Sequence, residues 1–164
     1  MPKLIILRGN SGSGKSSVAK LLQQRLGRNT MLISQDMVRR EILWVQDNID
    51  TPAAALLKTL LQYGRKNCEI VILEGILYTA WYESLFICAQ QEYGDEIFAY
   101  YYDLPFAETV VRHKTKANSN EFGEEKMWRW WHEKDFISFI PEKILSKEMT
   151  AAETVDYIYQ EVIG

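Results

Sequence analysis

Residues 9–17 read GNSGSGKSS, a stretch in which glycine, lysine and serine stand at fixed spacings. Gly9, Gly14, Lys15 and Ser16 fit the pattern G-x-x-x-x-G-K-[S/T], which is typical of a loop that binds phosphate groups. Glycine lets the backbone adopt positive φ and approach a ligand closely, so that successive amide N–H groups converge on phosphate oxygens. The stretch therefore predicts a phosphate-binding loop.

The flanking residues place this loop between a strand and a helix. Residues 3–7, KLIIL, form a short apolar run that suits a buried parallel strand. After the loop, apolar residues recur at helical spacing up to Gly27, namely Val18, Leu21, Leu22 and Leu26. A flexible Gly/Ser linker is the alternative interpretation, but a linker would not lie between a buried strand and an amphipathic helix. The helix N-terminus would add partial positive charge beneath the phosphates.

The motif assigns distinct roles within the loop. Lys15 is expected to reach the β and γ phosphates of a nucleotide, and Ser16 to offer its hydroxyl to Mg²⁺, which prefers a few hard oxygen ligands and the phosphates themselves. The expected nucleotide contacts are Gly9, Asn10, Ser11, Gly12, Ser13, Gly14, Lys15, Ser16 and Ser17.

The composition favours one globular domain spanning residues 1–164. Hydrophobic residues make up 47% of the chain, and the net charge of −3 does not predict broad attraction to nucleic acid or to an anionic membrane. No stretch approaches the roughly 20 apolar residues of a membrane span. The two cysteines, Cys68 and Cys88, fit reduced residues better than a disulfide framework. We therefore expect a cytoplasmic protein.

Further strands and helices alternate along the chain. Strands are predicted at 30–34, 69–75 and 97–103, and helices at 35–44, from Thr51-Pro52 to about Gly64, around 81–89, from Pro105 to about Lys114, and after a capping box formed by Thr150 and Glu153. This alternation predicts parallel βαβ units and a three-layer αβα sandwich of the α/β class. In such sheets, ligands lie beyond the carboxyl ends of the strands.

Two predicted strands are followed by residues suited to substrate binding. Asp36 and Arg39 lie three apart after the strand 30–34. The Asp36 carboxylate could accept the proton of an acceptor hydroxyl, and Arg39 could orient the acceptor. Alternatively, Asp36 or Ser34 simply caps the helix and Arg39 is solvated. Glu74-Gly75 ends the strand 69–75, where the acid suits the metal's water shell and glycine leaves space for a substrate; a solvated strand end is the other interpretation.

A basic and polar stretch predicts a lid at about residues 113–126. Arg112, Lys114 and Lys116 precede a polar segment and would close over the nucleotide phosphates. A helix C-terminus also attracts basic residues through its dipole, which is the plainer explanation. Tryptophans in the following stretch 127–136 are expected to pack in the core or against the lid, and stacking on a base is the less favoured interpretation. His113 and His132 receive no role.

The chain resembles the small phosphate-loop (P-loop) kinases with an AAA-type ATP-binding domain, namely the kinase domain of polynucleotide kinase, chloramphenicol phosphotransferase and the zeta toxins. The stretch 103–116, DLPFAETVVRHKTK, is similar to the run that leads into the polynucleotide kinase lid. The resemblance implies ATP-dependent phosphorylation of a hydroxyl, Mg²⁺, a five-stranded parallel sheet and a helical lid. It also implies that Asp36 is the general base, that Arg39 binds the acceptor and that Arg112 contacts phosphate. The family's second lid arginine falls on Lys116, which keeps the charge but lacks the bidentate fork.

The leading hypothesis is a kinase that phosphorylates a hydroxyl of a small molecule. A polynucleotide 5′-hydroxyl kinase is the first alternative, which the lid resemblance supports and the acidic balance opposes. A non-catalytic nucleotide-binding switch or adaptor is the second. The candidate residues are Lys15, Asp36, Arg112 and Lys116 for catalysis, the loop residues 9–17 and Arg112 for nucleotide binding, Asp36, Arg39, Glu74 and Gly75 for the acceptor, and Ser16 for the metal. The acceptor's identity, the base preference and the oligomeric state stay open.

Overall fold

A computed structural model describes residues 1–10, 12–114, 131 and 134–164. Within them, five strands form one parallel sheet in the order β2-β3-β1-β4-β5. The strands are β1 (Lys3–Gly9), β2 (Thr30–Ser34), β3 (Ile70–Gly75), β4 (Ile97–Tyr102) and β5 (Glu142–Leu145). The expected five-stranded parallel sheet is confirmed.

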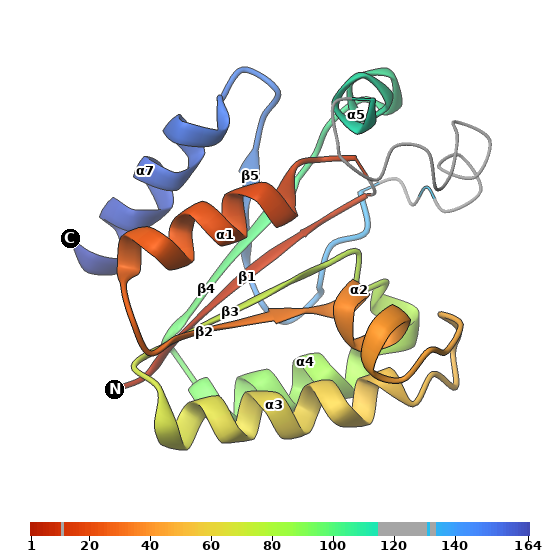
Figure 1. Cartoon of the computed structure of the whole chain (residues 1–164), viewed down its shortest axis with the longest axis vertical. Helices are drawn as coiled ribbons and strands as arrows, with labels where there is room; N and C mark the ends of the chain where they lie inside the picture. Colours follow the sequence, from red (N-terminus) through yellow and green to blue (C-terminus); the bar gives the residue numbers. More distant parts are fainter. Residues whose placement is uncertain (11, 115–130, 132–133) are drawn as a thin grey trace.

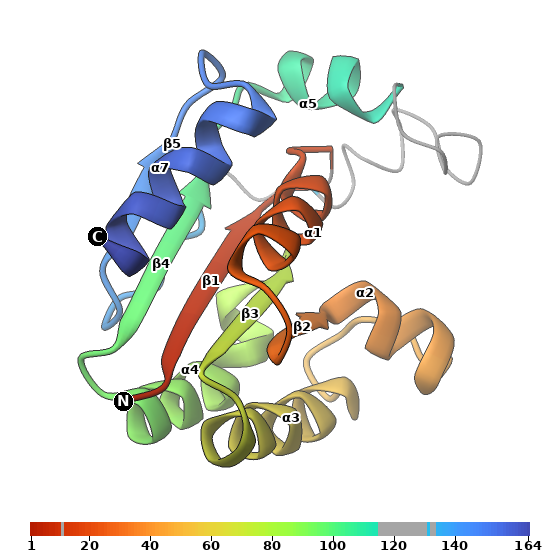
Figure 2. The ribbon, with the colours of Figure 1, turned by 60° about the vertical axis from the view of Figure 1, so that its left-hand side comes forward.

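Helices cover both faces of this sheet, as Figures 1 and 2 show. One face carries α1 (Lys15–Leu26) and α7 (Ala151–Ile163), and the other carries α3 (Ala53–Asn67) and α4 (Thr79–Tyr93). Three short elements extend from the carboxyl ends of the strands, namely α2 (Gln35–Met37), the π-helical turn η1 (Val38–Ile42) and α5 (Phe106–His113). The three-layer αβα architecture is therefore as predicted.

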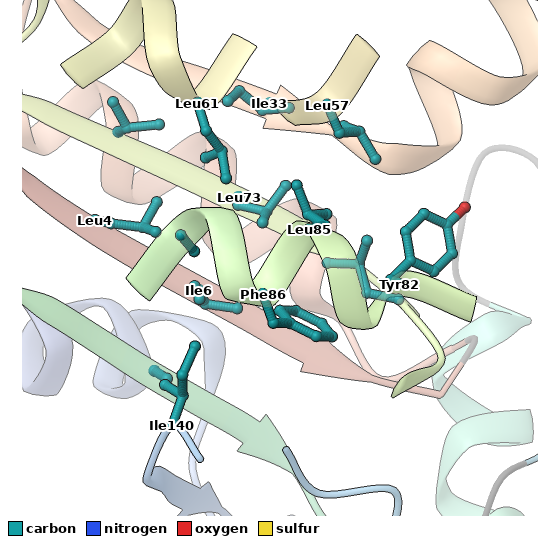
Figure 3. Close-up of a cluster of buried hydrophobic side chains, with 14 of the residues drawn as sticks. Leu4, Ile6, Ile33, Leu57, Leu61, Leu73, Tyr82, Leu85, Phe86 and Ile140 are labelled. Atoms are coloured by element: carbon teal, nitrogen blue, oxygen red, sulfur yellow. The ribbon is translucent and has the colours of Figure 1, made fainter. Parts of the chain in front are cut away.

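The central strand β1 separates two hydrophobic cores. Leu4 and Ile6 are buried toward α3 and α4, in the cluster drawn in Figure 3. Ile5 and Leu7, which point to the opposite face, are buried against the cluster that includes residues of α1 and α7. A strand that is buried on both faces has a nearly continuous apolar sequence, which explains why residues 3–7 could be identified as a buried strand.

Two predicted helices differ from the structure. The expected helix 35–44 is the short α2 followed by η1, and it ends at Ile42. The helix expected to stop near Gly64 continues to Asn67. Gly64 is a packing position, because a Cβ built there would lie 2.5 Å from Cγ2 of Val71 on β3.

Smaller features follow the expectations more closely. The capping box of Thr150 and Glu153 opens α7 as predicted. Cys68 and Cys88 are both free. Among the described residues, no helix combines the length and the hydropathy needed to cross a membrane.

Candidate functional site

The phosphate-binding loop connects β1 to α1, at the carboxyl edge of the sheet. Gly9, Gly12 and Gly14 have φ values of 147°, 84° and 97°, a region that residues with a Cβ rarely adopt. At Gly9, a Cβ would also lie 2.8 Å from Cβ of Tyr102 on the neighbouring strand β4. The backbone conformation therefore favours glycine at all three positions, and the close approach of β4 is a second requirement at Gly9.

Polar side chains gather inside this loop. Lys15 begins α1, is buried, and donates from Nζ to the carbonyl of Asn10 at 3.3 Å. The backbone N–H of Ser13 donates to the same carbonyl at 3.3 Å. The Ser13 hydroxyl is fully buried and has no hydrogen-bond partner among the described residues. Such a loop, with an ammonium group and an unused hydroxyl, suits an anionic ligand that accepts hydrogen bonds. Ser11 lies outside the described residues.

Arg112 lies against the loop, as its predicted role requires. This residue of α5 donates from Nη1 to the Ser13 carbonyl at 2.9 Å, from Nη2 to the Lys147 carbonyl at 3.3 Å, and from Nε to Glu108 at 3.2 Å. The structure thus brings together two cations, Lys15 and Arg112, that are 97 residues apart in sequence by subtraction of their numbers. Lys116 and residues 115–126 of the predicted lid lie outside the described part of the chain.

Ser16 and Glu74, the two residues predicted to lie near a metal ion, are in contact. The Ser16 hydroxyl donates to Oε2 of Glu74 at 3.0 Å, and the Glu74 side chain is buried at the end of β3. Hydroxyl and carboxylate oxygens are the hard donors that Mg²⁺ prefers, usually together with waters and substrate phosphates. The described residues hold no cluster of three or more His, Cys, Asp or Glu that could bind a metal on its own. The donor set therefore fits Mg²⁺ that arrives with a nucleotide.

Asp36 and Arg39 follow β2 at the same edge of the sheet. Ser34 at the end of β2 pairs in register with Glu74 of β3, so the residues that follow β2 begin beside the strand end that carries Glu74. The Ser34 hydroxyl accepts a hydrogen bond from the N–H of Met37 at 3.3 Å and is the helix cap. The Asp36 carboxylate is 59% exposed and forms an ion pair with Arg39 at 3.5 Å. The capping alternative thus belongs to Ser34, and Asp36 is left facing solvent and Arg39.

Three further polar residues at this edge of the sheet, which the sequence did not predict, are joined by hydrogen bonds. Gln35 is buried and donates from Nε2 to Asp47 at 2.9 Å and to the hydroxyl of Tyr82 at 3.0 Å. The Tyr82 hydroxyl donates to the other Asp47 oxygen at 2.6 Å. Burial raises the pKa of Asp47 above its ordinary value of 3.8, against the lowering effects of the Tyr82 hydrogen bond and the Arg39 charge. No local pattern marks these residues, because their partners come from distant segments.

Gly75 is required by one of these residues. A Cβ at this position would lie 2.6 Å from Cβ of Gln35. The space that this glycine leaves is filled by the Gln35 side chain of the protein itself. Whether Gly75 contacts a substrate stays a prediction.

The aromatic stretch and the two histidines are only partly described. Trp131 packs edge-on against Phe106 of α5, with ring centroids 5.3 Å apart. His113 is buried at the end of α5. Trp128, Trp130 and His132 lie outside the described residues.

Comparison with known proteins identifies the domain type. A family model described as an AAA domain matches residues 4–134. No curated protein matches the chain in sequence.

Solved structures show the fold. The APS kinase CysC of Mycobacterium tuberculosis, solved in complex with AMPPNP and APS, superposes with a TM-score of 0.69 at 19% identity, over 99% of this chain and 98% of that chain. A gluconokinase from Sinorhizobium meliloti 1021 superposes with a TM-score of 0.67 at 16% identity, over 98% of this chain and 91% of that chain. A tunicamycin resistance protein of Deinococcus radiodurans superposes with a TM-score of 0.66 at 16% identity, over 99% of this chain and 96% of that chain. The chain therefore has the P-loop fold of these kinases.

Proposed function

This chain belongs to the AAA domain family, and from that premise we propose that it transfers the γ-phosphate of ATP to a hydroxyl group of a small-molecule acceptor. The observation that carries the proposal is the convergence of Lys15, Arg112 and Ser16 on one phosphate loop, with Asp36 beside it at the same edge of the sheet. The solved kinases with this fold support the same reaction class.

In the proposed reaction, each of these residues has a separate role. Asp36 accepts the proton of the acceptor hydroxyl as that oxygen forms a bond to the γ-phosphorus, and the bond from phosphorus to the bridging oxygen breaks to release ADP. Lys15 and Arg112 stabilise the charge that moves onto the bridging and peripheral oxygens. Mg²⁺, when bound, supplies further positive charge at the phosphates. The Ser16 hydroxyl would hold the ion, and Glu74 would orient that hydroxyl and attract the waters of the ion. Positioning and electrostatics supply most of the rate in phosphoryl transfer.

A small acceptor is favoured over nucleic acid by the charge of the protein. The net charge is −3, and the Arg39 guanidinium already pairs with Asp36. A polynucleotide kinase needs cations along a strand of phosphates. Phosphorylation of a 5′-hydroxyl oligonucleotide in preference to every small acceptor would establish that alternative instead.

The test is ADP formation from ATP and Mg²⁺ in the presence of nucleosides, sugars, aminoglycosides, amphenicols and 5′-hydroxyl oligonucleotides. The proposal expects one small-molecule class to stimulate ADP formation, and expects Lys15→Met to reduce that rate by about 10²–10³-fold. Lys20→Met, an exposed position on α1, is the matched control and should leave the rate unchanged. Tight ATP binding without stimulated ADP formation by any acceptor would favour a nucleotide-binding switch.

A further inference from the structure

The turn between β3 and α4, residues 75–79, holds a strained residue. Leu77 is fully buried and has φ of 47°, a left-handed conformation that non-glycine residues seldom adopt. Such a conformation is strained and persists only where the surroundings over-determine it. The turn lies at the carboxyl edge of the sheet, directly after the predicted acceptor residue Gly75.

Two buried side chains hold Leu77 from opposite sides. Its N–H donates to Oε1 of Gln35 at 3.0 Å, and its carbonyl accepts from Nη2 of Arg8 at 3.1 Å. Arg8 and Gln35 are almost completely buried. Both backbone groups of the strained residue are therefore fixed by side chains from other strand ends.

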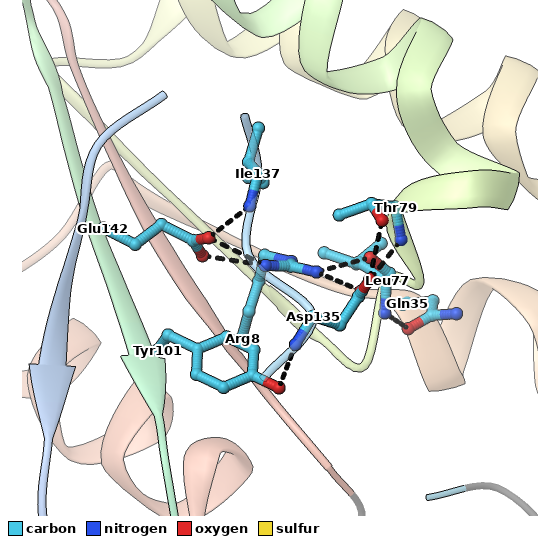
Figure 4. A network of polar contacts seen from close by, with 8 residues as sticks. All are labelled: Arg8, Gln35, Leu77, Thr79, Tyr101, Asp135, Ile137 and Glu142. Carbon is cyan, nitrogen blue, oxygen red and sulfur yellow. Dashed lines mark hydrogen bonds and ion pairs between the residues drawn. The ribbon is translucent and has the colours of Figure 1, made fainter. Parts of the chain in front are cut away.

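Arg8 is itself fixed by a dense set of contacts, shown in Figure 4. Its Nη1 donates to both carboxylate oxygens of Glu142 at 2.9 Å, and its Nη2 pairs with Asp135 at 2.8 Å. The guanidinium also lies 5.2 Å from the ring centre of Phe86 and 5.4 Å from that of Tyr101. Asp135 in turn accepts from the N–H and the hydroxyl of Thr79, which ties the far end of the turn to the same cation.

A buried ion pair of this kind is weak evidence for stability alone. Desolvation offsets much of the attraction, and well-packed apolar side chains often serve stability equally well. The planar guanidinium offers several donors in fixed directions, so it can bind two carboxylates and a carbonyl at once. This directional property points to a positioning role.

Gln35 connects the turn to the predicted base. It directly precedes Asp36, and besides Leu77 it contacts Asp47 and Tyr82. Movement of this side chain would therefore displace the turn and the start of α2 together. The contacts that shape the phosphate loop, from Lys15, Ser13 and Arg112, include neither Arg8 nor Gln35.

We infer that Arg8 and Gln35 are positioning residues that hold the strained turn 75–79 as a preformed wall of the acceptor site. They act on the acceptor half of the reaction and leave nucleotide binding unchanged. This inference rests on the proposed phosphotransferase function.

The kinetic test compares Arg8→Lys and Gln35→Leu with the surface controls Arg25→Lys and Gln62→Leu. The probe is the panel acceptor that best stimulates ADP formation. Each test variant is expected to raise the acceptor KM or lower kcat by about tenfold, the size of one or two lost hydrogen bonds. The dissociation constant for ATP should stay within about twofold of wild type. Equal weakening of ATP binding, or no effect on acceptor kinetics, would overturn the inference.

A second measurement does not depend on activity. Amide hydrogen exchange across residues 76–79 of the ATP-bound chain should become about tenfold faster in Gln35→Leu, and not in Gln62→Leu. Unchanged exchange would show that Leu77 is not held by these contacts and would refute the positioning role. If wild-type protein phosphorylates no acceptor, the proposed function fails and the acceptor-site role fails with it. In that case the exchange rates still show whether the contacts of Gln35 hold the turn in place.

Discussion

At the scale of single residues, Lys15 and Ser16 begin α1 directly after the phosphate loop, where Lys15 donates to the Asn10 carbonyl and Ser16 donates to Glu74. Both positions could be predicted from the spacing of a local motif. Glu74 was predicted from its place after a buried strand, and its bond to Ser16 agrees with the expected metal side. Gln35 and Asp47 could not be predicted, because neither belongs to a local motif and their hydrogen bonds connect separate segments.

Glu74 should control the Mg²⁺ requirement through Ser16. Glu74→Gln keeps the size of the side chain but removes the charge that orients the Ser16 hydroxyl and attracts the metal's waters. We expect the Mg²⁺ concentration for half-maximal ADP formation to rise about 10–100-fold. Titration of ADP formation with Mg²⁺ checks this.

The control for this titration is Glu83→Gln, an exposed position on α4 that should behave as wild type. ATP binding without Mg²⁺ should be unchanged in both variants. If Glu74→Gln requires the same Mg²⁺ concentration as wild type, Glu74 has no role in binding Mg²⁺.

Asp47 should make the protein less stable as the pH rises. Burial, the largest effect, raises its pKa above 3.8, so the folded state binds a proton that the unfolded state releases. Through this group, stability is lost between pH 3.8 and the raised folded pKa, where the charged carboxylate must be kept buried beside Tyr82, Arg39 and Asp36. Asp47→Asn removes that titration. Its free energy of unfolding relative to wild type should therefore increase as the pH rises from 3.8 through the raised folded pKa.

Urea denaturation across this range provides the measurement for Asp47→Asn. Asp50→Asn, an exposed substitution in the same loop, is the control. A relative stability of Asp47→Asn that decreases as the pH rises would contradict the assignment.

At the scale of elements, helix α3 shows how a local signal can mislead. Glycine commonly follows the end of a helix, and Gly64 was interpreted in that way. In the structure α3 continues to Asn67, and Gly64 lets the helix approach Val71 and Met31 of the sheet. Tertiary packing, which sequence spacing does not report, decides the role of this residue.

Gly64→Ala should therefore destabilise the fold although alanine is the better helix former. The added methyl group meets Cγ2 of Val71 on a buried strand that cannot easily move. We expect the free energy of unfolding to decrease by about 1–3 kcal/mol, more than the ~1 kcal/mol that helix propensity returns. Urea denaturation measures the difference, with the exposed Gln62→Ala of the same helix as control. Equal or greater stability of Gly64→Ala would show that α3 can shift away from the sheet.

Strand β5 and the turn η1 were missed for related reasons. β5 has four residues, EKIL, with no long apolar run, and among the described strands it pairs with β4 alone. The resemblance to a five-stranded family implied a fifth strand but did not place it in the sequence. The predicted helix after β2 is interrupted by η1, a form with no reliable sequence signal that often occurs at functional sites.

At the scale of the whole molecule, the parallel sheet gathers the site at one edge. The layers could be predicted from the buried apolar runs of β1 and β3 and from the alternation of strands with helices. Buried strands appear in the sequence as continuous apolar runs, and the helices that cover them show apolar residues at helical spacing. The Arg8 network was not predictable, since Arg8 and Glu142 are 134 residues apart and meet only when β5 joins the sheet. The proposed nucleotide side of this edge is thus defined by a sequence motif, and the proposed acceptor side is defined by tertiary contacts.

The most direct test of this account is single-turnover transfer of γ-labelled phosphate from ATP to the acceptor, comparing wild type with Asp36→Asn and with the exposed control Glu41→Gln. Wild type and Glu41→Gln should place the label on the acceptor hydroxyl, while Asp36→Asn should bind ATP normally and transfer label about 10²–10⁴-fold more slowly. Full transfer by Asp36→Asn would contradict Asp36 as the base. Failure of wild type to label any acceptor would contradict the phosphotransferase itself.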